Sequence, residues 1–210
     1  MTGVAHASLG WMLAEAGRGD RAFRAAVLAA ALAPDLDGLT VLLGTAAYDH
    51  YHHLLSHNAL FSLLVSLVAV ALCRRSILKV FLFTQLAFYT HYFGGYFFTK
   101  YPLYWLYPFS DRPFFTENSV WVGHPVNQVL NFAFLLFLGL VAWRTGRTPL
   151  EVLSPNLDRR IVNYLFRSKS ATCHLCSANT NEVCETCGYP VCKRHFSLTR
   201  GFTVNCVECR

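Results

Sequence analysis

Long apolar runs constrain this chain more than any other feature. They occupy residues 59–73, 80–98 and 126–143. A helix that crosses a bilayer needs about 20 such residues, so we expect the first helix to begin nearer Leu54. The chain is 54% hydrophobic and only 14% charged, whereas soluble domains carry about 25% charged residues. The sequence therefore predicts a membrane protein, with a soluble but unusually apolar helical domain as the alternative.

The N-terminal part predicts shorter helices. Residues 4–16 and 21–33 have helical composition, but each run is too short to span a bilayer. Pro34 is expected to interrupt the second run, because proline lacks an N–H donor and clashes with the preceding turn. No secretory signal is evident, since the N-terminus lacks a basic start. We expect an all-α polytopic membrane domain with half-length helices, plus a small Cys-rich two-zinc domain.

Positive charge and cysteine concentrate towards the C-terminus. Residues 1–143 carry 8 Lys/Arg and 7 Asp/Glu, whereas residues 144–210 carry 10 and 5. All cysteines except Cys73 also lie in this second part. Two unlike regions are the natural interpretation. The predicted organisation is a helical membrane metal-site domain over 1–147, a linker over 148–170 and a zinc-binding module over 171–210.

Basic residues also predict the orientation. Short loops rich in Lys and Arg stay on the cytoplasmic side. The relevant side chains are Arg74, Arg75, Lys79, Arg144 and Arg147. We therefore expect a multi-pass protein of the cytoplasmic (inner) membrane with a cytoplasmic C-terminal tail. A reducing compartment agrees with this, because free thiolates persist there.

The tail contains four pairs of potential zinc ligands. Within each pair two residues separate the ligands, so both can reach one ion at about 2.3 Å. The eight ligands are Cys173, Cys176, Cys184, Cys187, Cys192, His195, Cys206 and Cys209. They suffice for two tetrahedral Zn²⁺ ions with no open position, which is typical of structural zinc. A disulfide framework would need an oxidising compartment and would leave His195 and one tail cysteine unexplained.

Spacing alone does not determine which ligand pairs share an ion. It also does not identify the partner of the tail. The pairs can be used sequentially, or interleaved as first with third and second with fourth. The stretch CETCGYPVCKRHF, residues 184–196, resembles cross-brace modules of the AN1 and B-box type, which favours interleaving. The basic surplus permits contact with nucleic acid or anionic lipid. Because no recognition helix or aromatic stacking pattern is visible, we expect a protein or membrane-surface partner rather than nucleic acid.

Histidine and aspartate recur within the apolar part. Ionisable residues at membrane depth are costly and usually mark a site, and imidazole with carboxylate is a ligand set for zinc, iron or manganese. On a continuous helix His50, His53 and His57 would share one face, although His50 and His124 are expected to be interfacial. The candidates are His6, Asp35, Asp37, His50, His52, His53, His57, His91, Asp111 and His124. They predict one or more divalent ions of unknown identity.

Five short segments occur in the order of a known family. They are AHASLGWMLAE, ALAPDLDGL, HHLLSHNALF, THYFGGYFF and LYPFSDRPF. Across residues 1–143 the chain resembles the bacterial membrane-bound metal-dependent hydrolases of the DUF457 or YdjM-like group. That group is similar to zinc-dependent phospholipase C. The resemblance implies metal ligands at His6, Asp35, His52, His57 and His91, with Asp35 and Asp37 as candidate catalytic acid–base residues.

The resemblance implies hydrolysis of a phosphoester in a lipid or lipid-linked substrate. Two positions depart from the family pattern: Gly95 stands where an aspartate is usual, and His53 where an arginine is usual. Asp111 or His53 are candidates to replace the missing carboxylate. The alternative is a non-catalytic membrane scaffold with a vestigial or structural metal site, whose zinc module recruits a partner. A metal or proton transporter is a third hypothesis.

Overall fold

The structure, a computed structural model, describes residues 2–73, 76–117, 119–166, 171–180, 182–184, 186–198 and 204–209. This part of the chain is mostly helical. Its α-helices are α1 (Gly3–Ala16), α2 (Arg21–Leu32), α3 (Thr45–Tyr51), α4 (Ala59–Cys73), α5 (Ile77–Phe98), α6 (Pro125–Thr145) and α7 (Pro155–Phe166). Its 3₁₀ segments are η1 (Ala33–Leu43), η2 (Pro149–Val152) and η3 (Val207–Cys209).

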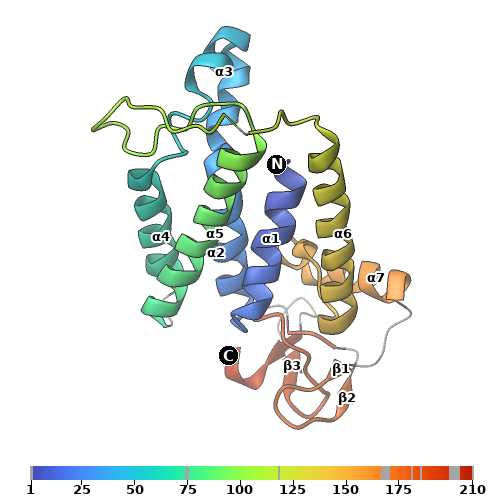
Figure 1. Ribbon diagram of the computed structural model, residues 1–210. Coiled ribbons are helices and arrows are strands. Elements are labelled where there is room, and N and C mark those ends of the chain that lie inside the picture. Colours follow the sequence, from blue (N-terminus) through green and yellow to red (C-terminus); the bar gives the residue numbers. More distant parts are fainter. Residues whose placement is uncertain are drawn as a thin grey trace.

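The cysteine-rich tail adds two small antiparallel ribbons. One pairs β1 (Ala171–Thr172) with β2 (Asn179–Thr180), and the other pairs β3 (Phe196–Leu198) with β4 (Val204–Cys206). Helices α1, α2, α4, α5 and α6 form a bundle, in which α2 packs against both α1 and α5. The tail lies at one end of this bundle, and α3 with the connection between α5 and α6 lies at the other (Figure 1).

Helix α2 ends at Leu32, two residues before the proline that was expected to interrupt it. Asp20 caps its start by accepting a 2.9 Å hydrogen bond from the N–H of Phe23. From Ala33 the chain takes 3₁₀ geometry and runs on to Leu43. The proline sits in the first turn of this new segment, where its missing N–H costs little. The predicted break is therefore a change of helix type.

Two helical segments in the described residues are long and apolar enough to cross a membrane. They are Arg21–Leu43, which joins α2 to η1, and Pro125–Thr145, which is α6. Helix α4 is apolar but shorter. The expectation that α4 begins near Leu54 is wrong, because turns occupy residues 52–58 and the helix starts at Ala59.

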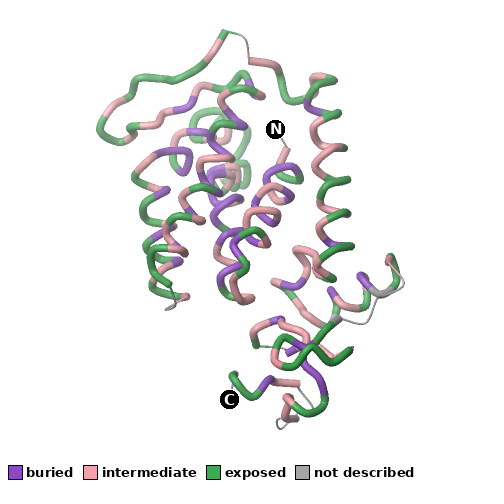
Figure 2. The backbone as a smooth tube through the Cα atoms, turned by 60° about the horizontal axis from the view of Figure 1, so that its bottom comes forward, coloured by how far each residue is buried: buried purple, intermediate pink, exposed green. Residues whose placement is uncertain are grey.

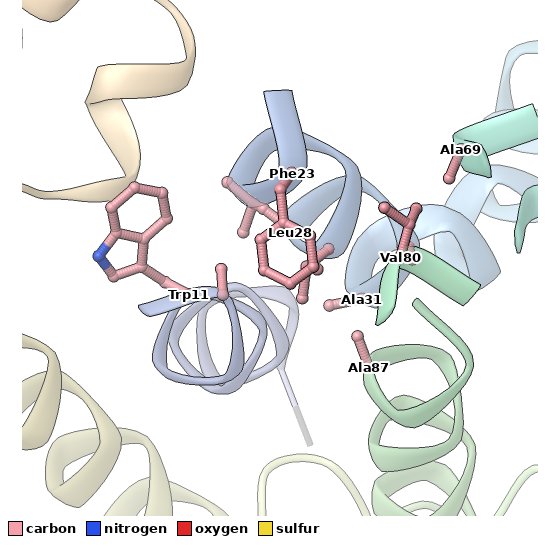
Figure 3. Close-up of a cluster of buried hydrophobic side chains, with 10 residues drawn as sticks. Trp11, Phe23, Leu28, Ala31, Ala69, Val80 and Ala87 are labelled. Carbon is pink, nitrogen blue, oxygen red and sulfur yellow. The ribbon is translucent and has the colours of Figure 1, made fainter. Parts of the chain in front are cut away.

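The centre of the bundle is built largely from small side chains. Trp11, Phe23 and Leu28 supply its bulk, and buried alanines such as Ala31 and Ala87 let the helices approach closely (Figure 3). Small residues at helix contacts are characteristic of packing inside membranes. Much of the apolar surface of α4 and α6 is exposed instead (Figure 2).

Polar side chains also join α4 to α5 across the bundle. Thr84 donates a 2.9 Å hydrogen bond to the Oγ of Ser66. The amide of Gln85 donates to Ser66 Oγ at 2.8 Å and to the carbonyl of Ser62 at 2.9 Å. Each polar group thus finds a partner among apolar neighbours, and Gln85 has a packing role.

The close approach of α1 and α2 gives a testable prediction at Gly10. A Cβ there would overlap the Cβ of Ala31, so Gly10→Ala should destabilise the protein by about 1–3 kcal/mol. Gly139 in α6 faces open space, so Gly139→Ala should be neutral or stabilising by up to about 1 kcal/mol. Denaturant unfolding in detergent micelles measures both. Equal effects of the two substitutions would contradict the packing interpretation.

Candidate metal centre

Three ligand-bearing side chains converge at the end of the bundle that lies away from the tail. They are Asp35 from η1, His57 from the turns before α4, and His91 from α5. Their ligand atoms lie within 4.8 Å of one another. Oδ1 of Asp35 is 3.3 Å from Nε2 of His91 and 4.0 Å from Nε2 of His57. Two histidines and one carboxylate are a common ligand set for a catalytic divalent ion.

Each of these histidines is oriented through its other ring nitrogen. His91 Nδ1 lies 2.7 Å from the carbonyl oxygen of Ala31, which can only accept a hydrogen bond. His57 Nδ1 lies 2.9 Å from Oδ2 of Asp37. These contacts place the ring protons on Nδ1 and leave the Nε2 lone pairs facing Asp35. Among the described residues His57 Nε2 is buried without a hydrogen-bond partner, as a metal ligand would be.

Asp37 is a hub of hydrogen bonds. Besides His57, its carboxylate contacts Nδ1 of His52 at 2.9 Å and accepts from the backbone N–H of His53 at 2.9 Å and of Ser56 at 3.4 Å. Its side chain is fully buried. Asp37 was predicted as a catalytic residue. Its contacts are those of a carboxylate that orients His57, a candidate metal ligand.

The other predicted ligands surround the cluster. The ring of His6 stacks on that of His91, with centroids 3.6 Å apart. Nδ1 atoms of His6 and His53 are buried without hydrogen-bond partners in the described part of the chain. Burial, together with the neighbouring His57 and His52, lowers the pKa of His53 to about 2, so this imidazole is neutral. His52 is held by Asp37 and does not belong to the group of three.

These residues border a cavity of about 360 Å³. Helix α3 ends at Tyr51, and His53 adopts a positive φ of 70°. His50, His53 and His57 therefore do not share the face of a continuous helix. The cavity is lined by Thr2, Gly3, His6, Asp35, Gly38, Tyr48, His52, His53, His57, His91, Gly95, Thr99, Tyr101 and Val122.

Three further candidates lie outside the cluster, and several contributors were not foreseen. His50 and Asp111 are exposed, and His124 is the N-cap of α6. Gly95 lines the cavity, and a Cβ there would lie 3.7 Å from the nearest methyl of Leu103.

The contributors that sequence reasoning missed are Ser56, the carbonyl of Ala31, Tyr48 and Tyr101. The sequence offers one sign of the role of Ser56, which is that it directly precedes the candidate ligand His57.

The tail gathers its ligands into two groups. The first contains Cys173, Cys176, Cys192 and His195. The sulfurs of Cys176 and Cys192 lie 3.5 Å apart, and His195 Nδ1 lies 3.7 Å from Cys173 Sγ and 3.5 Å from Cys192 Sγ. Ligands held about 2.3 Å from one tetrahedral ion lie roughly 3.8 Å apart. The group thus has the dimensions of a zinc site.

The second group contains Cys184, Cys187 and Cys206. The sulfurs of Cys187 and Cys206 are 3.7 Å apart, and Cys184 Sγ accepts a 3.1 Å hydrogen bond from the N–H of Cys206. The side chain of Cys209, the predicted fourth ligand, lies outside the described residues. The grouping joins the first pair with the third, and the second with members of the fourth, as interleaving requires.

Electrostatics favour the thiolate form of one cysteine in each group, Cys173 and Cys184, whereas the pKa of Cys176 is raised by its cysteine neighbours. Burial opposes ionisation of Cys173, but hydrogen bonds from backbone N–H groups outweigh it and bring its pKa down to about 6. At Cys184, burial again raises the pKa and backbone hydrogen bonds lower it, and the result is a pKa of about 7. The thiolate is the form that binds metal.

The hub at Asp37 gives a prediction about metal affinity. Asp37→Asn should weaken metal binding at the Asp35–His57–His91 cluster by about 10–100-fold, because the amide no longer holds His57 as a carboxylate does. Asp111→Asn is the control, since Asp111 is exposed and does not line the cavity. Chelator competition with elemental analysis measures the affinity. Indistinguishable affinities of the two variants would remove Asp37 from this role.

Comparison with known proteins addresses the helical part. The family model of the YdjM inner membrane protein matches residues 1–156. A search of curated proteins finds no match, and a search of solved structures finds none either. The match covers more than half of the 210 residues and contains every residue of the candidate metal centre. The chain belongs to the YdjM inner membrane protein family.

Proposed function

We propose that this protein is a membrane-bound metal-dependent hydrolase that cleaves a phosphoester in a lipid or lipid-linked substrate. The convergence of Asp35, His57 and His91 on a cavity of about 360 Å³ carries this proposal. Three protein ligands leave a coordination position open for water or substrate, as catalytic sites require. The membrane location favours an amphiphilic substrate.

The residues of the centre divide the work. A bound divalent ion would lower the pKa of water and polarise a phosphoryl oxygen. His57 and His91 present lone pairs, because Asp37 and the Ala31 carbonyl hold their Nδ1 protons. The side chain of Asp35 is 41% exposed, so it can exchange a proton with the cavity. The carboxylate of Asp37 is fully buried and already occupied by hydrogen bonds, so we assign the acid–base role to Asp35.

One observation favours a second function. Gly95 offers no side-chain oxygen to the cavity, and Asp111 does not line it. His53 lines the cavity and is the remaining substitute for the missing carboxylate. If this substitution supports no chemistry, the protein is a non-catalytic membrane scaffold with a structural metal site.

We also propose a multi-pass arrangement in the inner membrane. The cavity is lined in part by α3 and by the connection between α5 and α6, which lie at the end of the bundle opposite the tail (Figure 1). This arrangement suits a centre on the outer side and a cytoplasmic tail. Arg144 lies in the last turn of the candidate span α6 and Arg147 follows the helix, at the end where the tail begins. The zinc module would then meet a protein or membrane-surface partner in the cytoplasm, and nucleic acid is not expected.

For the tail we propose two structural Zn²⁺ ions. Two observations support them. The pKa of Cys173 is lowered, and the sulfur–sulfur distances of 3.5 and 3.7 Å match the separations expected around a tetrahedral zinc ion. Cys209 completes the second site in this proposal. Both sites are then filled by protein ligands alone, so their binding energy contributes to folding.

The hydrolase proposal predicts that His57→Ala and Asp35→Ala lower phosphoesterase turnover by at least 10²-fold while the protein stays folded, because each removes a ligand. His50→Ala is the matched control, since His50 lies in the same stretch but is exposed. A panel of phospholipids and lipid phosphates serves as substrate. No turnover by metal-loaded wild-type protein on the whole panel would leave the scaffold function.

The tail proposal predicts the zinc content of the purified protein. Cys192→Ser should lower it by about one zinc per chain, because it opens the first tail site. Cys73→Ser should leave it unchanged, since Cys73 lies in α4 away from both groups. Elemental analysis under reducing conditions measures this. Equal zinc content in both variants would argue against zinc at the first site.

A further inference from the structure

Four charged side chains meet where the tail contacts the bundle. Arg24 of α2 forms a two-pronged ion pair with Glu151 of η2, and Arg147 forms one with Glu15 of α1. The Nε of Arg24 is also 3.6 Å from Glu15. Arg24 and Glu151 are each 1% exposed. Displacing one partner of such a buried network is strongly destabilising, because it leaves the other charge buried without compensation.

Three consecutive tail residues cover this network. The carbonyl of Cys187 accepts a 3.0 Å hydrogen bond from the N–H of Arg21, the first residue of α2. The ring of Tyr189 lies 5.6 Å from the guanidinium carbon of Arg24 and 6.0 Å from that of Arg147. Gly188, with a φ of 74°, sits directly on Glu151 and Arg24. A Cβ at Gly188 would overlap Glu151 Oε1 and lie 2.8 Å from Arg24 Nη2.

The same three residues belong to the loop of the second metal group. Cys187 contributes its sulfur to that group and its carbonyl to α2. The loop closes through hydrogen bonds from Cys184 N–H to the Tyr189 carbonyl at 2.9 Å and from Gly188 N–H to the Cys184 carbonyl at 2.8 Å. Without a cation, ionised sulfurs about 3.7 Å apart would repel each other. The conformation of the loop residues that contact the bundle therefore depends on whether a metal ion is bound by the sulfurs of this group.

We propose that zinc at the Cys184–Cys187–Cys206 site fixes the tail onto the bundle and thereby stabilises the membrane domain. The tail is then a metal-dependent clamp and not a freely tethered module. This inference rests on the proposed tail zinc, although not on hydrolase activity. Zinc binding and bundle stability are linked in both directions, because one contact surface serves both.

The sequence offers a selective probe of the bundle. All four tryptophans, Trp11, Trp105, Trp121 and Trp143, lie before residue 144, and the tail contains none. Thermal unfolding of the full chain in detergent, followed by tryptophan fluorescence, therefore reports the membrane domain. Elemental analysis of the same samples reports the zinc.

Cys206→Ser should lower zinc by about one per chain and lower the tryptophan-detected Tm by about 4 °C or more. Gly188→Asn should lower the Tm similarly by displacing the loop. Gly146→Asn is the control, because Gly146 also has a positive φ of 69° but faces open space, and asparagine tolerates this conformation. Its Tm should stay within about 2 °C of wild type.

The double variant Cys206→Ser/Gly188→Asn should be no less stable than the worse single variant, because both remove the same contact. Additive losses would overturn the clamp, and so would a zinc loss in Cys206→Ser with an unchanged Tm. Unchanged zinc in Cys206→Ser would instead contradict the second tail site itself. The two failures are therefore distinguishable, and neither depends on turnover.

Discussion

The carboxylate of Asp37 is the interaction on which the candidate centre depends. It contacts two imidazoles and accepts two backbone hydrogen bonds from the segment between α3 and α4. That segment would otherwise expose polar backbone groups within an apolar protein, which is costly. By satisfying them, Asp37 holds residues 52–58 in turns and points His57 at Asp35. One buried acid thus sets both the local backbone and the direction of a ligand.

Much of the fold follows from the sequence, because apolar runs and helix signals are local. Helices were predicted close to their observed bounds at residues 4–16, 80–98 and 126–143, and a Cys-rich C-terminal region was expected. The α-helix ends before Pro34 as expected, but its continuation in 3₁₀ geometry was not foreseen, because a proline is tolerated in the first turn of such a segment. Helical spacing also failed for His50, His53 and His57, because hydrogen bonds to Asp37 outweigh local helix propensity.

The sequence identified most residues of the candidate site, but it did not show what each of them does there. His6, Asp35, His57 and His91 gather around one cavity, because four separate segments of the chain meet there. No local pattern could separate Asp35, which faces the cavity, from Asp37, which faces the histidines. The two differ only in which neighbours the fold brings to them, and Ser56 and the Ala31 carbonyl became visible only with the fold.

The continuous segment formed by α2 and η1 connects the two ends of the molecule that carry the candidate metal sites. Its first N–H binds the carbonyl of Cys187 in the tail, and its far part carries Asp35 and Asp37. Small residues hold this segment tightly against α1 and α5, so it can shift only if its neighbours shift too. A packed rod that touches both ends is the physical requirement for coupling between them. Seating of the tail and geometry of the candidate centre therefore depend on the same element.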